Sequence, residues 1–193
     1  MKPTRDSLFA IAFLVVLVGL GLFSLSRAGG QGGLGPGGDF TLTSAQGPVA
    51  TQSFRGRVVL VFFGYLGCPD VCPKALGAQG AAFRLLTPQE RSRVAGLFIS
   101  LDPERDTPAA VQECAQAFHP LIQGLTGPAP ELAEVARRYG VLFSRSGTDS
   151  AGRYAVDHTS DTFVIAPDGR LVARLPASTP PEAIAAELRH WLR

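Results

Sequence analysis

Two cysteines, Cys68 and Cys72, stand in C-x3-C spacing directly after an apolar run. Pro69 and Pro73 follow them in the sequence. A proline disfavours the α region for the residue before it and suits the first position of a helix. The spacing therefore predicts that Cys72 is extended, near the N-cap of a helix that begins at Pro73. Because a helix N-terminus favours a thiolate, we expect the pKa of Cys72 to lie below the value of about 8.5 of a free cysteine.

This thiol pair has two simple interpretations. A structural disulfide is the less favoured one, because α/β folds place their ligands where strands lead into helices. The second is a metal site, since thiolates select Cu(I), zinc or iron–sulfur clusters. The third cysteine, Cys114, lies on the apolar stripe of the segment Pro108 to Phe118, so we expect it to be buried in the core and unreactive.

The elements that must position the cysteines alternate along the chain. Val58 to Phe63 is a continuous apolar run that is typical of a buried strand, and Pro73 to Leu86 has the periodicity of a helix. Further strands are expected at 39–42, 94–100, 141–143, 153–156, 162–166 and 170–175, and further helices at 108–118, 131–139 and 181–192. This order predicts an α/β fold, a mixed β-sheet flanked by helices on both faces.

The N-terminus carries an uncharged apolar segment, Leu8 to Leu25, which is long enough to be a candidate membrane span. Lys2 and Arg5 precede it, which favours a cytoplasmic N-terminus and an exported remainder. The alternative is a cleaved signal segment, because Ser26-Arg27-Ala28 offers the small residues of a cleavage site. Both interpretations place the rest of the chain on the exported, periplasmic or extracytoplasmic side of the cell membrane.

The chain of 193 residues thus divides into three parts. Residues 1–27 are expected to form a single-pass transmembrane anchor or signal segment, 28–38 a linker with seven glycines, and 39–193 one folded domain. After residue 27 the chain has 15 basic and 15 acidic residues, and it has no nucleic-acid-binding motif. We therefore expect no nucleic-acid partner.

Several separated segments resemble the Sco/SenC family. They are Gly64-Tyr65-Leu66-Gly67-Cys68-Pro69-Asp70-Val71-Cys72-Pro73, Ser100 to Pro108, Phe118-His119-Pro120 with Gly124 to Gly127, and Val156-Asp157-His158-Thr159. The resemblance covers residues 39–193 and implies a thioredoxin-like fold. It also implies a membrane-tethered, copper-binding protein that helps to assemble the binuclear CuA centre of cytochrome c oxidase subunit II. One departure is Leu66-Gly67, where many members have Thr-His.

The same resemblance implies that Cys68, Cys72 and His158 are the metal ligands. Two thiolates and one imidazole form a soft set that suits Cu(I), with Cu(II) as a second state. Zinc would need a fourth ligand, either water or a carboxylate such as Asp70 or Asp157. The exported location and the low coordination number favour copper. Of the remaining histidines, we expect His119 to cap a helix or lie on the surface, and His190 to be solvated.

These residues lead to three functional hypotheses. The favoured one is a copper metallochaperone whose partners are oxidase subunit II, a copper donor protein and a thiol reductant. The reductant is needed because exported dithiols tend to be oxidised. The second hypothesis is a thiol–disulfide oxidoreductase that uses Cys68 and Cys72 to reduce the CuA cysteines. The third is a thioredoxin-fold peroxidase, against which the C-x3-C spacing and the nearby histidine argue.

Overall fold

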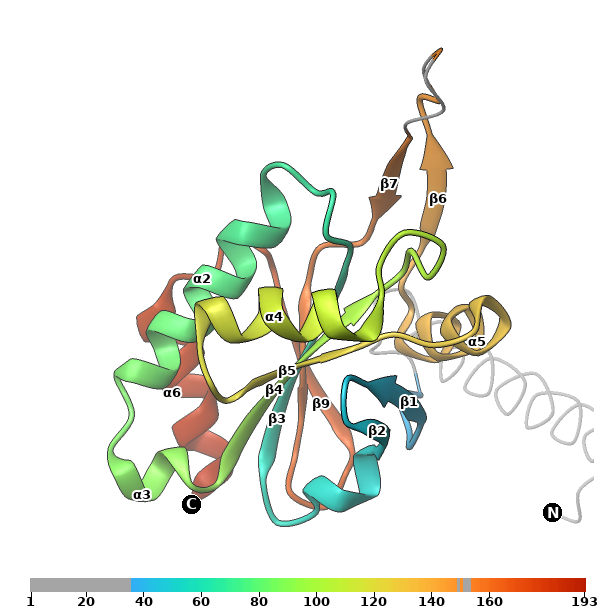
Figure 1. Cartoon of the computed structure of the whole chain (residues 1–193). Helices are drawn as coiled ribbons and strands as arrows, with labels where there is room; N and C mark the ends of the chain where they lie inside the picture. Colours follow the sequence, from blue (N-terminus) through green and yellow to red (C-terminus); the bar gives the residue numbers. More distant parts are fainter. Residues whose placement is uncertain (1–35, 149, 151–153) are drawn as a thin grey trace, which may run out of the picture. The chain divides into compact units, whose positions relative to one another are not determined.

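The computed structural model describes residues 36–148, 150 and 154–193. Its centre is a five-stranded sheet in the order β5-β4-β3-β8-β9 (Figure 1). The strands are β3 (Val58–Gly64), β4 (Val94–Ser100), β5 (Ile122–Leu125), β8 (Thr162–Ile165) and β9 (Leu171–Leu175). β3, β4 and β5 run parallel, whereas β8 and β9 join antiparallel. The mixed sheet expected from the sequence is confirmed.

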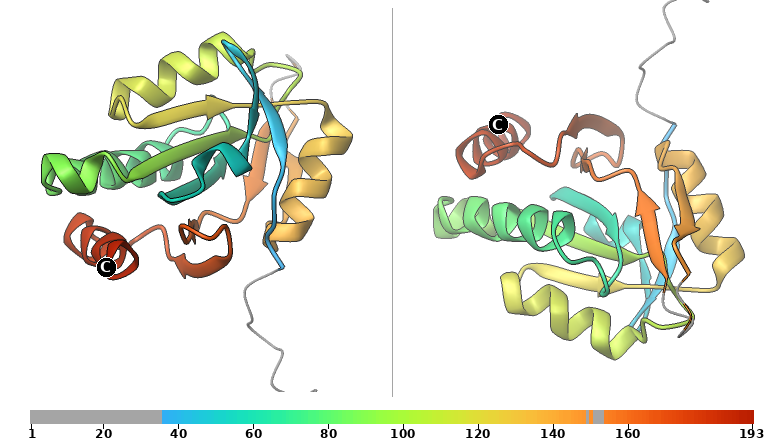
Figure 2. Two further views of the ribbon diagram at one scale, coloured as in Figure 1. Left: turned by 90° about the horizontal axis from the view of Figure 1, so that it is seen from below. Right: turned by 90° about the horizontal axis from the view of Figure 1, so that it is seen from above.

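Helices cover both faces of this sheet, which is why β3 and β4 are buried along their whole length. On one face, α2 (Val71–Arg84), α4 (Pro108–Phe118) and α6 (Pro181–Leu192) pack on side chains such as Phe62. On the other face, α5 (Ala129–Tyr139) contributes to a second apolar cluster. The two views of Figure 2 show α5 separated from the other three helices by the sheet.

The remaining elements are short. They are β1 (Thr41–Ser44), β2 (Gly47–Ala50), η1 (Thr51–Phe54), α3 (Pro88–Arg91), β6 (Phe143–Ser146) and β7 (Ala155–His158). β6 and β7 form an antiparallel hairpin in which Phe143 lies opposite His158. In Figure 1 this hairpin extends beyond the central sheet at the end where the loop between β3 and α2 lies. The hairpin therefore lies at the cysteine end of the sheet.

Two predictions about the cysteines are wrong. α2 begins at Val71 after the N-cap Asp70, so Cys72 is the second helical residue and not an extended one. Pro73 is tolerated as the third residue, because the first N–H groups of a helix have no intrahelical acceptor. Cys114 packs at the edge of the core and is half-buried, not buried as expected.

The expected membrane span, residues 8–25, lies outside the described residues, as does most of the expected linker. Within residues 36–148, 150 and 154–193, no helix has the length and apolar character that crossing a membrane requires.

Candidate metal centre

The structure brings together Cys68, Cys72 and His158. Cys68 lies in the loop after β3, Cys72 in the first turn of α2, and His158 at the end of β7. One ligand atom from each side chain lies within 4.8 Å of the others. The Cys72 Sγ is 3.5 Å from the His158 Nε2, and the Cys72 backbone N–H donates to the Cys68 Sγ over 3.4 Å. Two sulfur donors and one nitrogen donor thus converge from three separate elements.

The two thiols are more enclosed than the imidazole. Cys68 and Cys72 are 8% and 3% exposed, whereas His158 is half-buried. A shallow pocket of about 360 Å³ adjoins His158 and is also lined by Leu142, Phe143, Ser144, Asp157 and Thr159. Solvent therefore reaches the site from the side of the histidine.

The expected low pKa of Cys72 is wrong. Burial raises the pKa of the Cys72 thiol, and the neighbouring Cys68 raises it further, while a hydrogen bond with the Tyr65 backbone partly opposes this. The helix N-terminus offers only about 0.3–1 kcal/mol to a charge at the surface, which is less than the desolvation of a buried thiolate costs. A metal ion that binds Cys72 as a thiolate must therefore displace its proton.

The environment of His158 fixes which ring nitrogen is free to bind. Its Nδ1 lies 2.9 Å from the backbone carbonyl oxygen of Thr159. Because a carbonyl can only accept, Nδ1 carries the proton, and the lone pair is on Nε2, which faces Cys72. The rings of Phe62 and Tyr65 stand edge-on to the imidazole with centroids 6.1 Å away. An imidazole held in this way is suited to metal ligation.

Gly64, the last residue of β3, makes room for one of the sulfur atoms. A Cβ at this position would lie 2.7 Å from the Cys72 Sγ and 3.1 Å from ring atoms of Phe62 and Phe98. Any side chain here would displace the thiol or the rings. Gly64 belongs to one of the sequence motifs, but its role at the sulfur was not predicted.

Asp106 holds the cysteine loop in place and was likewise missed. Its carboxylate is 4% exposed and accepts hydrogen bonds from the Leu66 backbone N–H (2.8 Å) and the Ser100 hydroxyl (2.6 Å). The charged segment after β4 could have indicated this role. Neighbouring parallel strands end at the same edge of a sheet, so the segment after β4 is expected to lie near the cysteine loop after β3.

The other sequence-derived ligand candidates lie elsewhere. Among the described residues, the metal-binding group contains no carboxylate. Asp70 is exposed and pairs with Lys74 at 2.6 Å, and Asp157 is exposed as well. His119 is the C-cap residue of α4, and His190 is exposed, as the sequence predicted for both. Within the part of the chain that the structure describes, the zinc interpretation thus has no protein-supplied fourth ligand.

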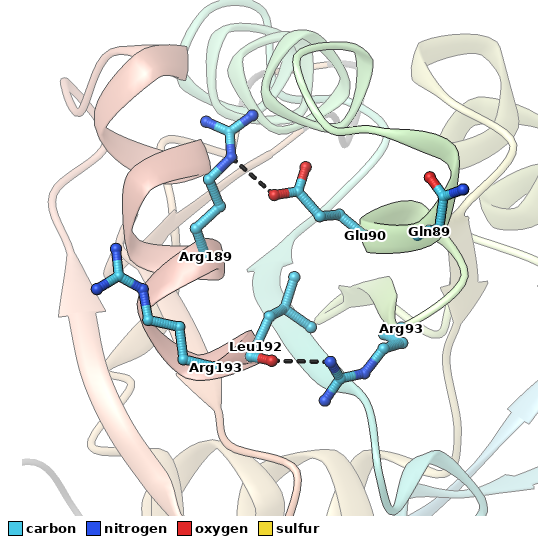
Figure 3. A pocket seen from close by; sticks show the side chains of 6 residues that line it. All are labelled: Gln89, Glu90, Arg93, Arg189, Leu192 and Arg193. Atoms are coloured by element: carbon cyan, nitrogen blue, oxygen red, sulfur yellow. Dashed lines mark hydrogen bonds and ion pairs between the residues drawn. The ribbon is translucent and has the colours of Figure 1, made fainter.

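A second pocket, of about 340 Å³, lies between α3 and α6 (Figure 3). Arg189 pairs with Glu90 at 3.0 Å, and Arg93 donates to the backbone carbonyl of Leu192 at 2.8 Å. The Arg93 carbonyl accepts from Val58, the first residue of β3, whereas the cysteine loop follows the last residue of that strand. A seven-residue strand spans about 20 Å, so this pocket is separate from the metal centre.

Comparisons with known proteins agree with this geometry. The family model described as SCO1/SenC matches residues 30–193. A bovine relative named "Protein SCO2 homolog, mitochondrial" is 42% identical over 134 residues, which cover 68% of this chain and 50% of the relative. This chain therefore spans about half the length of that curated relative.

Solved structures have the same fold. The structure of Bradyrhizobium japonicum ScoI with copper bound matches with a TM-score of 0.74 and 38% identity, covering 81% of this chain and 99% of that one. Apo Sco1 from Thermus thermophilus matches with a TM-score of 0.75 and 40% identity, over 83% and 93% of the two chains. The thioredoxin-like Sco fold is therefore confirmed, and this chain belongs to the SCO1/SenC family.

Proposed function

We propose that this protein is a copper metallochaperone that binds Cu(I), and Cu(II) as a second state, through Cys68, Cys72 and His158. Its acceptor is the CuA site of cytochrome c oxidase subunit II. The observation that carries the proposal is the convergence of two thiols and one imidazole nitrogen within 4.8 Å. The copper-bound state of the Bradyrhizobium relative supports the choice of metal.

The donor set favours copper over zinc on chemical grounds. Thiolate and imidazole are the soft and borderline ligands that Cu(I) prefers, and three of them make a complete set for a low-coordinate ion. Structural zinc sites are almost always tetrahedral and closed. The exposed Asp70 and Asp157 do not belong to the group of converging ligand atoms.

The arrangement also suggests how copper leaves. The two thiols are buried, and the imidazole lies beside the pocket that opens to solvent. An incoming ligand from the acceptor would therefore displace His158 first and the thiolates afterwards. Recharging would require a copper donor protein, and a thiol reductant would keep Cys68 and Cys72 reduced.

The proposed setting is the exported face of the cell membrane. Residues 1–27 would anchor the chain with a single span, and residues 28–38 would tether a domain formed by residues 39–193. As a flexible coil, a linker of this length separates its ends by about 15–20 Å. The domain would stay close to its membrane-embedded acceptor and could still reorient.

A thiol–disulfide oxidoreductase is the second candidate. Its support is the proximity of the Cys68 and Cys72 sulfur atoms, which lie within 4.8 Å of each other, so that a disulfide between them requires little movement. Against it stands the raised pKa of Cys72, because the thiolate is the attacking species in exchange. Metal binding does not need a preformed thiolate, because the metal ion displaces the thiol proton when it binds.

Replacing His158 separates the two candidates. His158→Ala should weaken copper binding, measured by titration against a competing chelator. It should leave the Cys68/Cys72 reduction potential within about 30 mV, or about 1.4 kcal/mol for two electrons, because exchange needs no imidazole ligand. The matched control is His190→Ala, which removes an exposed histidine and should change neither quantity. If His158→Ala leaves the copper affinity unchanged, the oxidoreductase function is favoured over the metallochaperone function.

A further inference from the structure

The loop between β4 and α4, residues 101–107, contacts both the cysteine loop and the β6–β7 hairpin. At one end it contacts the cysteine loop, through Asp106 and the Leu66 backbone. At the other end Asp102, which is 1% exposed, contacts the hairpin through Tyr154, the residue before β7. One short loop thus holds both segments that carry the proposed ligands.

The contacts to the hairpin are polar and specific. The Tyr154 hydroxyl donates to the Asp102 carboxylate over 2.7 Å. The Arg105 guanidinium pairs with the other oxygen of the same carboxylate and donates to the Tyr154 backbone carbonyl over 2.9 Å. We call Asp102, Arg105 and Tyr154 the Asp102 cluster. Hydrogen bonds that involve a charged group are about twice as strong as neutral ones, so the cluster is a firm attachment.

Arg105 also connects the hairpin to the wall of the metal centre. Its guanidinium carbon lies 3.7 Å from the centroid of the Tyr154 ring and 5.8 Å from that of Tyr65. The Tyr65 ring in turn stands edge-on to the His158 imidazole. A continuous set of contacts therefore runs from Tyr154 through Arg105 and Tyr65 to His158.

Strand β7 is consequently fixed at both ends. Before its first residue, Tyr154 bonds to Asp102 and Arg105. Just after its last residue, His158, the Thr159 backbone N–H donates to the Leu142 carbonyl over 2.9 Å. The Leu142 N–H donates back to the Thr159 hydroxyl over 3.1 Å. With the first attachment removed, the start of β7 would lose part of its support. The Thr159 bonds, the ion pair between Arg145 and Glu104 and the buried side chain of Val156 would still hold the rest of the hairpin.

We propose that the Asp102 cluster positions His158 against Cys72, so that Tyr154 acts as a positioning residue for copper binding although it touches no metal ligand. This inference rests on the proposed function, because it takes His158 as a ligand. Residues that orient a metal ligand are commonly worth about 10–100-fold in metal affinity. Tyr154 would act at the lower end of that range, because the Thr159 attachment remains.

The test is a double-mutant cycle with Tyr154→Phe, which removes the hydroxyl and keeps the ring over Arg105. In the wild-type background the variant should weaken Cu(I) binding about tenfold. In a His158→Ala background it should change binding by less than about twofold, because the ligand that it positions is gone. The matched control is Tyr139→Phe, which removes a hydroxyl bonded to the Gly38 carbonyl on the far face of the sheet. The control should leave copper affinity unchanged in both backgrounds.

A second measurement uses the metal-free protein. The nuclear Overhauser effect between the ring protons of His158 and Tyr65 should weaken in Tyr154→Phe and persist in Tyr139→Phe. Equal loss of copper affinity in both backgrounds, or an unchanged Overhauser effect, would overturn the positioning role. If His158→Ala alone leaves copper affinity intact, the proposed ligand set fails, and the Overhauser measurement still decides whether Tyr154 positions His158.

Discussion

Replacing Gly64 with alanine tests whether the end of β3 is shaped around the Cys72 sulfur. The new Cβ would lie 2.7 Å from the Sγ, about 0.8 Å inside the roughly 3.5 Å of a relaxed contact. The rings of Phe62 and Phe98, at 3.1 Å, close the other directions. We expect Gly64→Ala to cost about 1–3 kcal/mol in urea unfolding, as overpacking does, and to weaken Cu(I) binding because the sulfur must move.

Two further variants make this expectation specific. Gly77→Ala lies in α2, and among the described residues no atom outside its own helical backbone would come within 4 Å of the new Cβ. The substitution should therefore stabilise the protein by about 0.5–1 kcal/mol and leave copper binding unchanged. In a Cys72→Ala background the closest contact of the new methyl group disappears, and Gly64→Ala should cost less than it does with the sulfur present. If Gly64→Ala has the same stability in urea unfolding and the same copper affinity as the wild type, the packing argument is refuted.

Three other outcomes follow from the site. The metal-free protein should lose stability as the pH rises above about 9, by up to roughly 1.4 kcal/mol per pH unit, because folding raises the pKa of Cys72 and the thiol of the unfolded chain ionises first. In urea unfolding, Cys72→Ala should reduce this dependence of stability on pH more than Cys114→Ala does. Asp106→Ala should cost about 1–3 kcal/mol, since it removes the acceptor of the buried Ser100 hydroxyl and of the half-buried Leu66 amide, whereas Asp70→Ala at an exposed pair should cost under about 1 kcal/mol by the same assay. Oxidation to a Cys68–Cys72 disulfide should abolish copper uptake, and an oxidised sample that still develops thiolate-to-copper charge-transfer bands would contradict the ligand set.

Local sequence features predicted the elements whose ends are set by single residues. The helices Pro108–Phe118 and Pro181–Leu192 have the predicted bounds, because in each a proline occupies the first position and fixes the start. β5 was missed, because Ile122–Leu125 is too short to show periodicity and exists only through its pairing with β4. Strand pairing of that kind depends on residues far away in the sequence.

The same distinction holds for the site. The three proposed ligands were predicted from motifs, but the residues that support them were not, because their partners are distant. Asp106 holds Leu66 across 40 positions, and Tyr154 reaches Asp102 across 52. The pKa of Cys72 was predicted in the wrong direction because desolvation depends on how tightly the folded chain encloses the thiol, which no local pattern shows.

X-ray absorption at the copper K-edge, on protein loaded with Cu(I) under reducing conditions, examines the ligand set most directly. We predict a low-coordinate copper with two sulfur ligands and one imidazole, and His158→Ala should lose the imidazole contribution while keeping both sulfurs. A wild-type spectrum without an imidazole contribution, or one that His158→Ala leaves unchanged, would contradict the assignment of His158 and with it the proposed copper site.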